Sequence, residues 1–190
     1  MSVVLASGSP RRKELLEMLG VKELKIIPAK GEESAPEGLE PGELVMALAA
    51  QKGREVRELC SEDDVIIAAD TIVWHDGGVY GKPRSEEHAK EMLRSLQGRA
   101  HQVYTGVCVI RGESELLRYN MSHVRFRPMS EEEIDAYVAT GEPMDKAGAY
   151  GAQGKGAIFV EGIDGDFFNV MGLPLCTLGE MLKTQGVRVL

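Results

Sequence analysis

The sequence has few cysteines and no long apolar run, and these absences exclude several classes of protein. Its 190 residues contain three cysteines, Cys60, Cys108 and Cys176, which lie far apart and form no CxxC pair. They predict neither a disulfide framework nor a zinc knuckle, and we expect each to be a small buried side chain. No segment approaches the roughly eighteen apolar residues of a membrane span, and the first residues do not resemble a signal peptide. We therefore expect a cytoplasmic protein that does not enter a membrane.

Sequence signatures of several enzyme classes are also missing. His75, His88, His101 and His123 form no HxxxH or HExxH pair, and GxSxG is absent, which disfavours a zinc peptidase and a serine hydrolase. Neither GxxxxGKS/T nor GxGxxG occurs, so a P-loop or a dinucleotide-binding fold is not supported. We interpret the four histidines as surface or structural residues.

The charge balance restricts the size of any anionic ligand. With 22 basic and 30 acidic residues, the formal net charge is -8, which repels a nucleic-acid polymer but allows a local basic pocket for a small anion. A composition of 43% hydrophobic and 27% charged residues is typical of a globular protein. The length suits one core or two closely joined lobes, and we expect a single domain over residues 1–190.

Apolar periodicity and turn residues predict strands and helices that alternate at first and then give way to a hairpin-like middle. We expect strands at residues 3–6, 24–27, 65–69, 101–110, 116–126, 158–163 and 187–190. We expect helices at residues 10–19, 42–59, 85–96, 130–138 and 173–183. Pro10 suits the first helical position, Ser130-x-x-Glu133 is a capping box, and Asp76-Gly77-Gly78 marks a turn. Residues 141–156 are rich in glycine and have too little apolar periodicity to form a core. This order favours an α/β or mixed α+β fold, in which helices flank a sheet.

The segment Ser7-Gly8-Ser9-Pro10-Arg11-Arg12 lies between the first predicted strand and the first predicted helix. Backbone N–H groups at the start of a helix attract phosphate. Two arginines at this end oppose the helix dipole, and a bound anion would compensate them and accept forked hydrogen bonds. The segment therefore indicates an anion site, although a capped helix with solvated arginines explains the same residues.

Two further positions suit phosphate chemistry. Asp70 follows the predicted 65–69 strand, at the end where open α/β sheets present ligand-contacting groups, although capping the next turn is an alternative role. Lys82, in Gly81-Lys82-Pro83, suits either a phosphate contact or an exposed turn. Phosphoanhydride hydrolysis needs cations for the polyphosphate and carboxylates for a divalent metal and a water. The candidate cations are Arg11, Arg12, Lys52, Lys82 and Lys146, and the candidate carboxylates are Glu33 and Asp70.

Seven short stretches are spread over most of the chain, from residue 6 to residue 174. They are Ala6-Ser7-Gly8-Ser9-Pro10-Arg11-Arg12, Glu32-Glu33-Ser34, Ala69-Asp70-Thr71, Gly81-Lys82-Pro83, Val103-Tyr104-Thr105-Gly106-Val107, Asp145-Lys146-Ala147-Gly148-Ala149-Tyr150-Gly151-x-Gln153-Gly154 and Gly172-Leu173-Pro174. In this order they resemble the motifs of the Maf family of nucleoside triphosphate pyrophosphatases. A single motif arises easily by chance, whereas the ordered series does not.

The resemblance implies an elongated mixed sheet in two lobes with a nucleotide cleft between them, and a divalent cation, Mg²⁺ or Mn²⁺. Asp70 matches the family's catalytic base, and Glu33 matches a carboxylate that handles metal or water. These two carboxylates are the expected metal ligands. Lys52 and Lys82 match lysines that face the phosphates, and they complete the expected catalytic set.

Substrate choice is implied by three matched positions, Arg11, Thr71 and Gln153, which separate a pyrimidine-selective branch from a branch acting on modified guanine nucleotides. A glutamine amide both donates to and accepts from a pyrimidine edge, whereas a carboxylate suits guanine. The resemblance therefore implies hydrolysis of dTTP and UTP to the monophosphate and pyrophosphate. The expected substrate-binding residues are Ser7, Ser9, Arg11, Arg12, Thr71, Lys146 and Gln153.

Other functions stay open at this point. The family takes its name from septum formation, so a nucleotide-sensing regulator of cell division with little turnover is one alternative. A phosphatase or kinase that releases only the terminal phosphate is disfavoured by the missing P-loop. The physiological task, removing non-standard nucleotides or restraining division, is also open. The acidic composition leaves room for an apolar homodimer face, although no segment identifies one.

Overall fold

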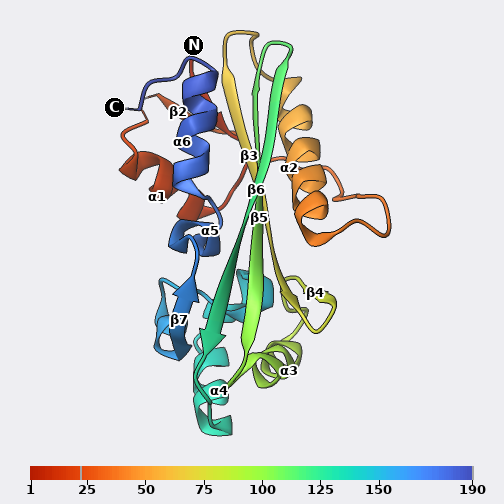
Figure 1. Ribbon diagram of the computed structural model, residues 1–190, viewed down its shortest axis with the longest axis vertical. Coiled ribbons are helices and arrows are strands. Elements are labelled where there is room, and N and C mark those ends of the chain that lie inside the picture. The colour runs from red at the N-terminus through yellow and green to blue at the C-terminus, as the bar shows by residue number, and fades with distance from the viewer. Residues whose placement is uncertain (22, 190) are drawn as a thin grey trace. The chain divides into compact units, whose positions relative to one another are not determined.

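The computed structural model describes residues 1–21 and 23–189, and across these residues helices flank a mixed sheet of seven strands (Figure 1). The strand order is β2-β1-β3-β5-β6-β7, with β4 paired to β3. β1 pairs in parallel with β2 and β3, whereas the β3–β4 and β6–β7 pairs are antiparallel. The predicted mixed α/β class is therefore confirmed.

The chain divides into two compact units. Unit 1 comprises Met1–Asp70, Thr105–Asn120 and Gly172–Leu190, and unit 2 comprises Thr71–Tyr104 and Met121–Met171. Three strands contribute residues to both units: β3 (Val65–His75), β5 (Ala100–Arg111) and β6 (Ser114–Phe126). The remaining elements belong to one unit each.

Unit 1 is built around a small apolar core between its strands and α2. Its elements are β1 (Val3–Leu5), α1 (Pro10–Met18), β2 (Leu24–Ile26), α2 (Pro41–Arg57) and α6 (Leu175–Thr184). α2 begins with Pro41 in its first turn and a capping box between Glu40 and Glu43. Gly106 of β5 lets this helix lie directly on the sheet, because a Cβ at that position would overlap the Val45 carbonyl. The close packing places the backbone of α2 against β5.

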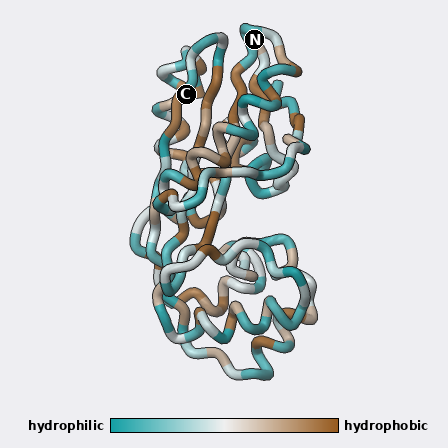
Figure 2. Tube along the Cα trace, turned by 90° about the vertical axis from the view of Figure 1, so that its right-hand side faces the viewer, coloured by the Kyte–Doolittle hydropathy of each residue, from teal (hydrophilic) through white to brown (hydrophobic). Residues whose placement is uncertain are grey.

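Unit 2 has its own core. Its elements are β4 (Gly78–Tyr80), α3 (Glu86–Leu96), α4 (Glu131–Val138), β7 (Val160–Asp164), α5 (Phe167–Met171) and three 3-10 helices at Glu142–Asp145, Ala147–Ala149 and Lys155–Phe159. The predicted capping box of Ser130 and Glu133 opens α4. Along the helices in Figure 2, hydrophilic and apolar residues alternate, as expected for helices that cover a core.

The prediction that residues 141–156 form no part of a core is wrong. Ala149 and Tyr150 are buried in the core of unit 2, and Tyr150 packs edge-on against Phe126 with ring centroids 4.7 Å apart. Gly148 has a positive φ of 68°, a conformation that glycine adopts without strain. This turn directs the two following side chains inward, which an analysis based on helical or strand periodicity does not detect.

The predicted end of the third strand is also wrong. β3 does not stop at residue 69 but runs from Val65 to His75, so that Asp70 lies in its middle. The residues after Asp70 are mostly β-branched or aromatic and therefore continue the strand. The strand ends at Asp76-Gly77, where both residues have positive φ, the geometry of a two-residue hairpin turn. The prediction that Asp70 lies at the carboxyl end of a strand is therefore wrong.

Smaller differences concern the C-terminal third. Residues 187–189 have no regular structure, contrary to the predicted terminal strand, whose last residue, 190, lies outside the described residues. The predicted 158–163 strand begins only at Val160, because Lys155–Phe159 is a 3-10 helix, and α5 was not predicted. Of the cysteines only Cys108 is buried as expected; Cys60 is half-buried and Cys176 is exposed on α6.

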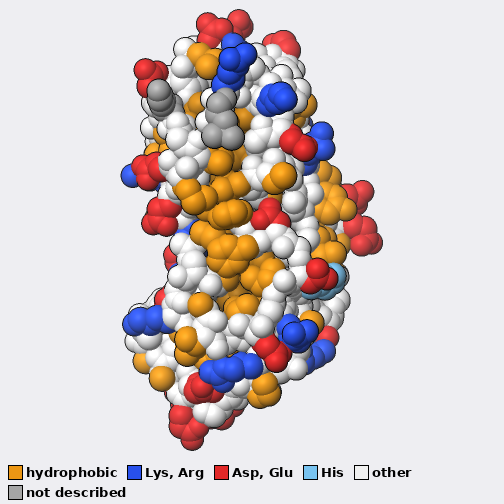
Figure 3. Space-filling view, turned by 60° about the vertical axis from the view of Figure 1, so that its left-hand side comes forward, with side chains coloured by type: hydrophobic (Ala, Val, Ile, Leu, Met, Phe, Trp, Pro, Cys, Tyr) orange, Lys and Arg blue, Asp and Glu red, His pale blue; other side chains and the backbone are white. Residues whose placement is uncertain are grey.

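The surface carries charges of both signs. On the face shown in Figure 3, basic side chains are scattered among acidic ones. None of the helices in the described part of the chain is both long and apolar enough to cross a membrane.

Candidate functional site

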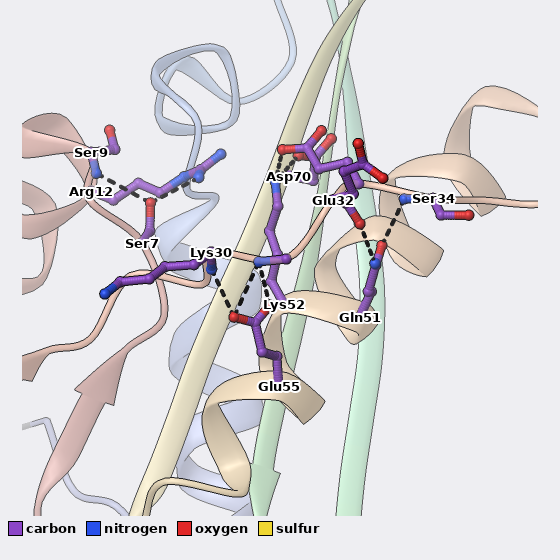
Figure 4. A network of polar contacts seen from close by, with 12 residues as sticks. Ser7, Ser9, Arg12, Lys30, Glu32, Ser34, Gln51, Lys52, Glu55 and Asp70 are labelled. Carbon is purple, nitrogen blue, oxygen red and sulfur yellow. Dashed lines mark hydrogen bonds and ion pairs between the residues drawn. The ribbon is translucent and has the colours of Figure 1, made fainter.

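The segment before α1 holds one of its two arginines in place. Arg12 donates from Nε to the Gly172 carbonyl (2.8 Å) and from Nη1 to Ser7 Oγ (3.2 Å), and the Ser9 backbone N–H also donates to Ser7 Oγ (3.2 Å; Figure 4). Among the described residues, no side-chain bond from Ser9 caps the helix. The alternative of a capped helix with solvated arginines is therefore wrong for Arg12.

Burial lowers the pKa of Arg12, and the nearby charges of Asp70 and Glu33 partly oppose this effect, while Arg11 adds to it. A guanidinium so placed still carries its charge at neutral pH, because its ordinary pKa is so high. Arg11 is half-buried beside it. The predicted anion segment thus brings two cations and two serines to the start of α1.

Lys52 joins the two predicted carboxylates. From α2, its Nζ lies 2.5 Å from Asp70 Oδ1 and 2.9 Å from Glu33 Oε1 (Figure 4 labels Lys52 and Asp70). The side chains of Lys52 and Asp70 are 18% and 11% exposed, whereas Glu33 is 58% exposed. An acid buried in mid-strand is costly unless it is paired, and Lys52 supplies the pairing charge. Three residues far apart in the sequence therefore meet at one point.

Two further α2 side chains position the loop that carries Glu33. The Glu55 carboxylate accepts the backbone N–H of Lys30 (2.7 Å) and of Gly31 (3.1 and 3.2 Å). The Gln51 amide donates to a loop carbonyl, that of residue 32 (2.6 Å), and accepts the N–H of residue 34 (3.0 Å; Figure 4). Of the two adjacent acids, Glu33 is thus the one whose carboxylate reaches Lys52.

Sequence reasoning missed Gln51 and Glu55. Both lie within one helical turn of Lys52, and Gln51 and Glu55 are four residues apart, so they share a helix face. This spacing of four residues was the feature of the sequence that could have indicated their shared role. Their partners are backbone groups about 20 residues away in sequence, and no local pattern identifies these.

The paired carboxylates fit a divalent metal that also binds phosphate. Asp70 and Glu33 each place an oxygen on the same ammonium, so they converge on one position for a cation. Mg²⁺ is usually held through one or two carboxylates together with waters and substrate phosphates. No group of three or more His, Cys, Asp or Glu residues among the described residues forms a complete protein cage for a metal. Two converging carboxylates therefore fit a metal that is also held by waters and phosphate oxygens.

In unit 2 a backbone hydrogen bond joins two segments that contain predicted residues. The backbone N–H of Gly148 donates to the Gly81 carbonyl (3.1 Å), which places the segment containing the exposed Lys82 beside the segment that leads to Gln153. Gly148 also allows close contact with β3, because a Cβ there would lie 2.8 Å from Val73 Cγ2. Thr71, two residues before Val73, directly follows Asp70 in the same strand.

Lys146 and Gln153 have different surroundings. The Lys146 ammonium donates to the Glu142 carbonyl (2.8 Å) and pairs with Asp145 Oδ1 (2.6 Å), and its side chain is only 13% exposed. Gln153 is exposed, and its side chain makes no hydrogen bond within residues 1–21 and 23–189. Lys146 thus supports its own segment, while the Gln153 amide has its donors and acceptor available.

Comparisons with known proteins cover nearly the whole chain. A family model described as Maf-like protein matches residues 2–185. A dTTP/UTP pyrophosphatase from Bacillus cereus (strain AH820) is 49% identical over 187 residues, covering 98% of this chain and 97% of the relative. A dTTP/UTP pyrophosphatase from Bacillus anthracis is 48% identical with the same coverage.

Solved structures with low sequence identity share the fold. The Ham1 protein of Staphylococcus aureus has a TM-score of 0.58 at 12% identity, covering 97% of this chain and 100% of that chain. A HAM1 protein from Coxiella burnetii has a TM-score of 0.53 at 20% identity, covering 97% and 99%. At these identities the likeness concerns the arrangement of strands and helices only.

Proposed function

The chain belongs to the Maf family, and from this premise we propose that it hydrolyses dTTP and UTP to the nucleoside monophosphate and pyrophosphate. It is an enzyme, a nucleoside triphosphate pyrophosphatase. The observation that carries the reaction is the meeting of two carboxylates, Asp70 and Glu33, at the Lys52 ammonium. Acids and cations held in this way are what hydrolysis of a phosphoanhydride requires.

Asp70 acts as the general base in the proposed mechanism. As a water oxygen bonds to the α-phosphorus, the Asp70 carboxylate accepts the water's proton, and the bond from that phosphorus to the bridging oxygen breaks. The electron pair of this bond leaves with pyrophosphate. Lys52 orients the base through the 2.5 Å contact with Asp70 Oδ1.

In the proposed mechanism, the predicted phosphate-binding cations balance the charge of the triphosphate. Arg12 and Arg11 lie at the start of α1, where backbone N–H groups also favour phosphate, and Ser7 and Ser9 belong to the same segment. Lys82 is an exposed cation of unit 2. Charge held in position before the reaction stabilises the leaving pyrophosphate without reorganisation.

Glu33 and Asp70 would hold the divalent cation, Mg²⁺ or Mn²⁺. When bound, such an ion supplies positive charge to the phosphates and lowers the pKa of a coordinated water. Glu33 keeps its position because Gln51 and Glu55 hold the surrounding backbone. Lys146 supports the segment that ends at Gln153, and Gln153 with Thr71 and Arg11 selects the pyrimidine.

The remaining properties follow from this substrate. We infer a cytoplasmic enzyme, since nucleoside triphosphates are made there, and a single functional domain over residues 1–190. The net charge of -8 and the mixed charges in Figure 3 favour a small nucleotide over a nucleic-acid polymer. A homodimer is compatible with the proposal but is not required by it.

The test is hydrolysis of a panel of nucleoside triphosphates with Mg²⁺, in which pyrophosphate and orthophosphate are measured separately. We expect dTTP and UTP to give the monophosphate and pyrophosphate. Release of orthophosphate would instead indicate a phosphatase, and a preference for 7-methyl-GTP would contradict the assignment of Gln153. Nucleotide binding with no turnover would favour a sensor that regulates cell division.

A further inference from the structure

The segment that carries Gln153 has almost no regular structure of its own, yet it is closely held. Residues 151–156 follow the 3-10 helix Ala147–Ala149, end in the first turn of the 3-10 helix Lys155–Phe159, and include three glycines. A Cβ on any of the three would meet another atom at less than 3 Å. The backbone of this segment therefore packs closely against specific neighbouring residues.

Those neighbours are side chains of Glu142, Tyr137 and Lys146. A Cβ at Gly154 would lie 2.6 Å from both oxygens of the Glu142 carboxylate, and one at Gly156 would lie 2.6 Å from the Tyr137 hydroxyl. A Cβ at Gly151 would lie 2.8 Å from Lys146 Cε. The Glu142 carboxylate thus packs against Gly154, which directly follows Gln153.

The Glu142 carboxylate accepts three hydrogen bonds. Its Oε1 accepts from the Tyr137 hydroxyl (2.9 Å) and from the N–H of Gly156 (3.1 Å), and its Oε2 accepts from the N–H of Lys155 (2.9 Å). Burial by itself raises the pKa of Glu142, but these bonds and the charge of Lys146 outweigh it and hold the pKa below its ordinary value. The group is therefore an ionised carboxylate, which accepts hydrogen bonds at both oxygens.

Tyr137 links this arrangement to a rigid element. It lies near the end of α4, is 4% exposed, and packs its ring edge-on against Phe159 with centroids 5.2 Å apart. Its hydroxyl also accepts the N–H of Gly151 (3.1 Å). Both ends of the segment around Gln153 are thus tied, directly or through Glu142, to one buried tyrosine.

We propose that Glu142 is a positioning residue for base selection: its carboxylate holds residues 151–156 in the conformation that presents Gln153 to a pyrimidine. The proposal rests on the proposed function, in which Gln153 recognises the base. A selective amide must be held in a fixed orientation, because a mobile one adapts to another base as well. Neither composition nor the family motifs pointed to Glu142.

The experiment measures kcat/KM for UTP and for GTP, and takes their ratio as the selectivity. The ratio does not depend on the fraction of folded enzyme, so a loss of stability does not change it. For Glu142→Gln we expect the ratio to fall about tenfold, because the amide keeps one acceptor oxygen and turns N–H groups toward donors. For Tyr137→Phe, which removes one hydroxyl, we expect a fall of about threefold. Glu161→Gln, which removes an exposed carboxylate of unit 2 paired with Arg125, should leave the ratio unchanged.

The same substitution in a Gln153→Ala background separates positioning from a general effect. If Glu142 acts through Gln153, Glu142→Gln should not lower the selectivity any further once Gln153 is absent. An unchanged ratio in the single variant, or an equal fall in both backgrounds, overturns the proposal. Failure of the proposed function is a different result, since the unmodified enzyme would then show no preference for UTP or would not release pyrophosphate.

Discussion

The two units hold functional residues of different kinds in place. In unit 1 the α2 side chains Lys52, Gln51 and Glu55 fix an acidic side chain, Glu33, that is itself more than half exposed. In unit 2 one carboxylate, that of Glu142, fixes a backbone from which Gln153 projects. The first arrangement sets where charges lie, and the second sets the direction of a neutral amide. We therefore expect substitutions around Lys52 in unit 1 to change the rate for every nucleotide, and substitutions around Gln153 in unit 2 to change the choice between nucleotides.

The largest expected effect tests the unit 1 side of this comparison. Asp70→Asn removes the proposed base, and kcat should fall about 1,000-fold, the middle of the range for loss of a general base. The ratio of kcat/KM between UTP and GTP should stay constant, and circular dichroism should show an intact fold. A variant with near-normal kcat would exclude Asp70 as the base, and a changed ratio would break the separation between the units.

A buried histidine gives the core of unit 2 a sensitivity to acid. Burial, and to a smaller extent the charge of His75, lower the pKa of His101 to about 3, and the side chain is 3% exposed. The unfolded chain binds a proton at this residue below about pH 6.5, whereas the folded chain does not until about pH 3, so stability is lost as the pH falls through this window. Between pH 6.5 and 5 the loss should be about 1.6 kcal/mol.

Urea unfolding at several pH values measures how the free energy of unfolding depends on pH. In His101→Gln, which keeps a polar group beside the Tyr150 hydroxyl, the free energy of unfolding should depend less on pH than in the unmodified protein. His123→Gln, at an exposed position, serves as the control and should retain the full dependence. Parallel curves for His101→Gln and the unmodified protein would show that His101 titrates normally.

A moderate effect is expected from the residue that anchors the unit 1 loop. Glu55→Gln leaves one acceptor oxygen for two backbone N–H groups, so Glu33 should lose its fixed position and kcat/KM should fall about tenfold for UTP and GTP alike. Glu58→Gln, on the exposed side of the same helix end, is the matched control. A fall confined to one nucleotide would contradict a role in positioning Glu33.

The smallest expected effect concerns a single methyl group in unit 2. In Gly154→Ala the new Cβ would lie 2.6 Å from the Glu142 carboxylate, which must move away. The UTP/GTP ratio should fall about fivefold, the size of a modest overpacking effect. Gly179→Ala in α6, where the added Cβ meets open space, should change neither the ratio nor the rate. If Gly154→Ala changed only the rate, the comparison between the two units would fail.

Sequence reasoning succeeded where the signal is local. The proline at the start of α1, the Ser130–Glu133 capping box and the Asp76-Gly77 turn each specify a structure within a few residues, and all three were confirmed. Sequence reasoning failed to continue the third strand through Asp70. An acid is tolerated inside a strand when it is paired, and the partner of Asp70 is Lys52, which lies 18 residues earlier in a helix.

The candidate site divides in the same way. The predicted residues of unit 1 were found together, since Lys52 contacts both Glu33 and Asp70. Their roles in catalysis stay predictions. Glu55 and Glu142 were missed because each binds the backbone of a distant segment. Nearly every residue has a backbone N–H, so the sequence does not show which of them is bound. Such residues are recognised only when the tertiary structure is known.

The continuity of β3 constrains how this protein can change over evolution. Asp70 and Thr71 are consecutive in one strand, and neighbouring strand residues face opposite sides of a sheet. Inserting or deleting a single residue between Val65 and His75 would exchange the sides for every position beyond it. New substrate preferences should therefore arise by replacement at position 71 and not by a change in length, and gaps in alignments of diverging lineages should fall outside this strand.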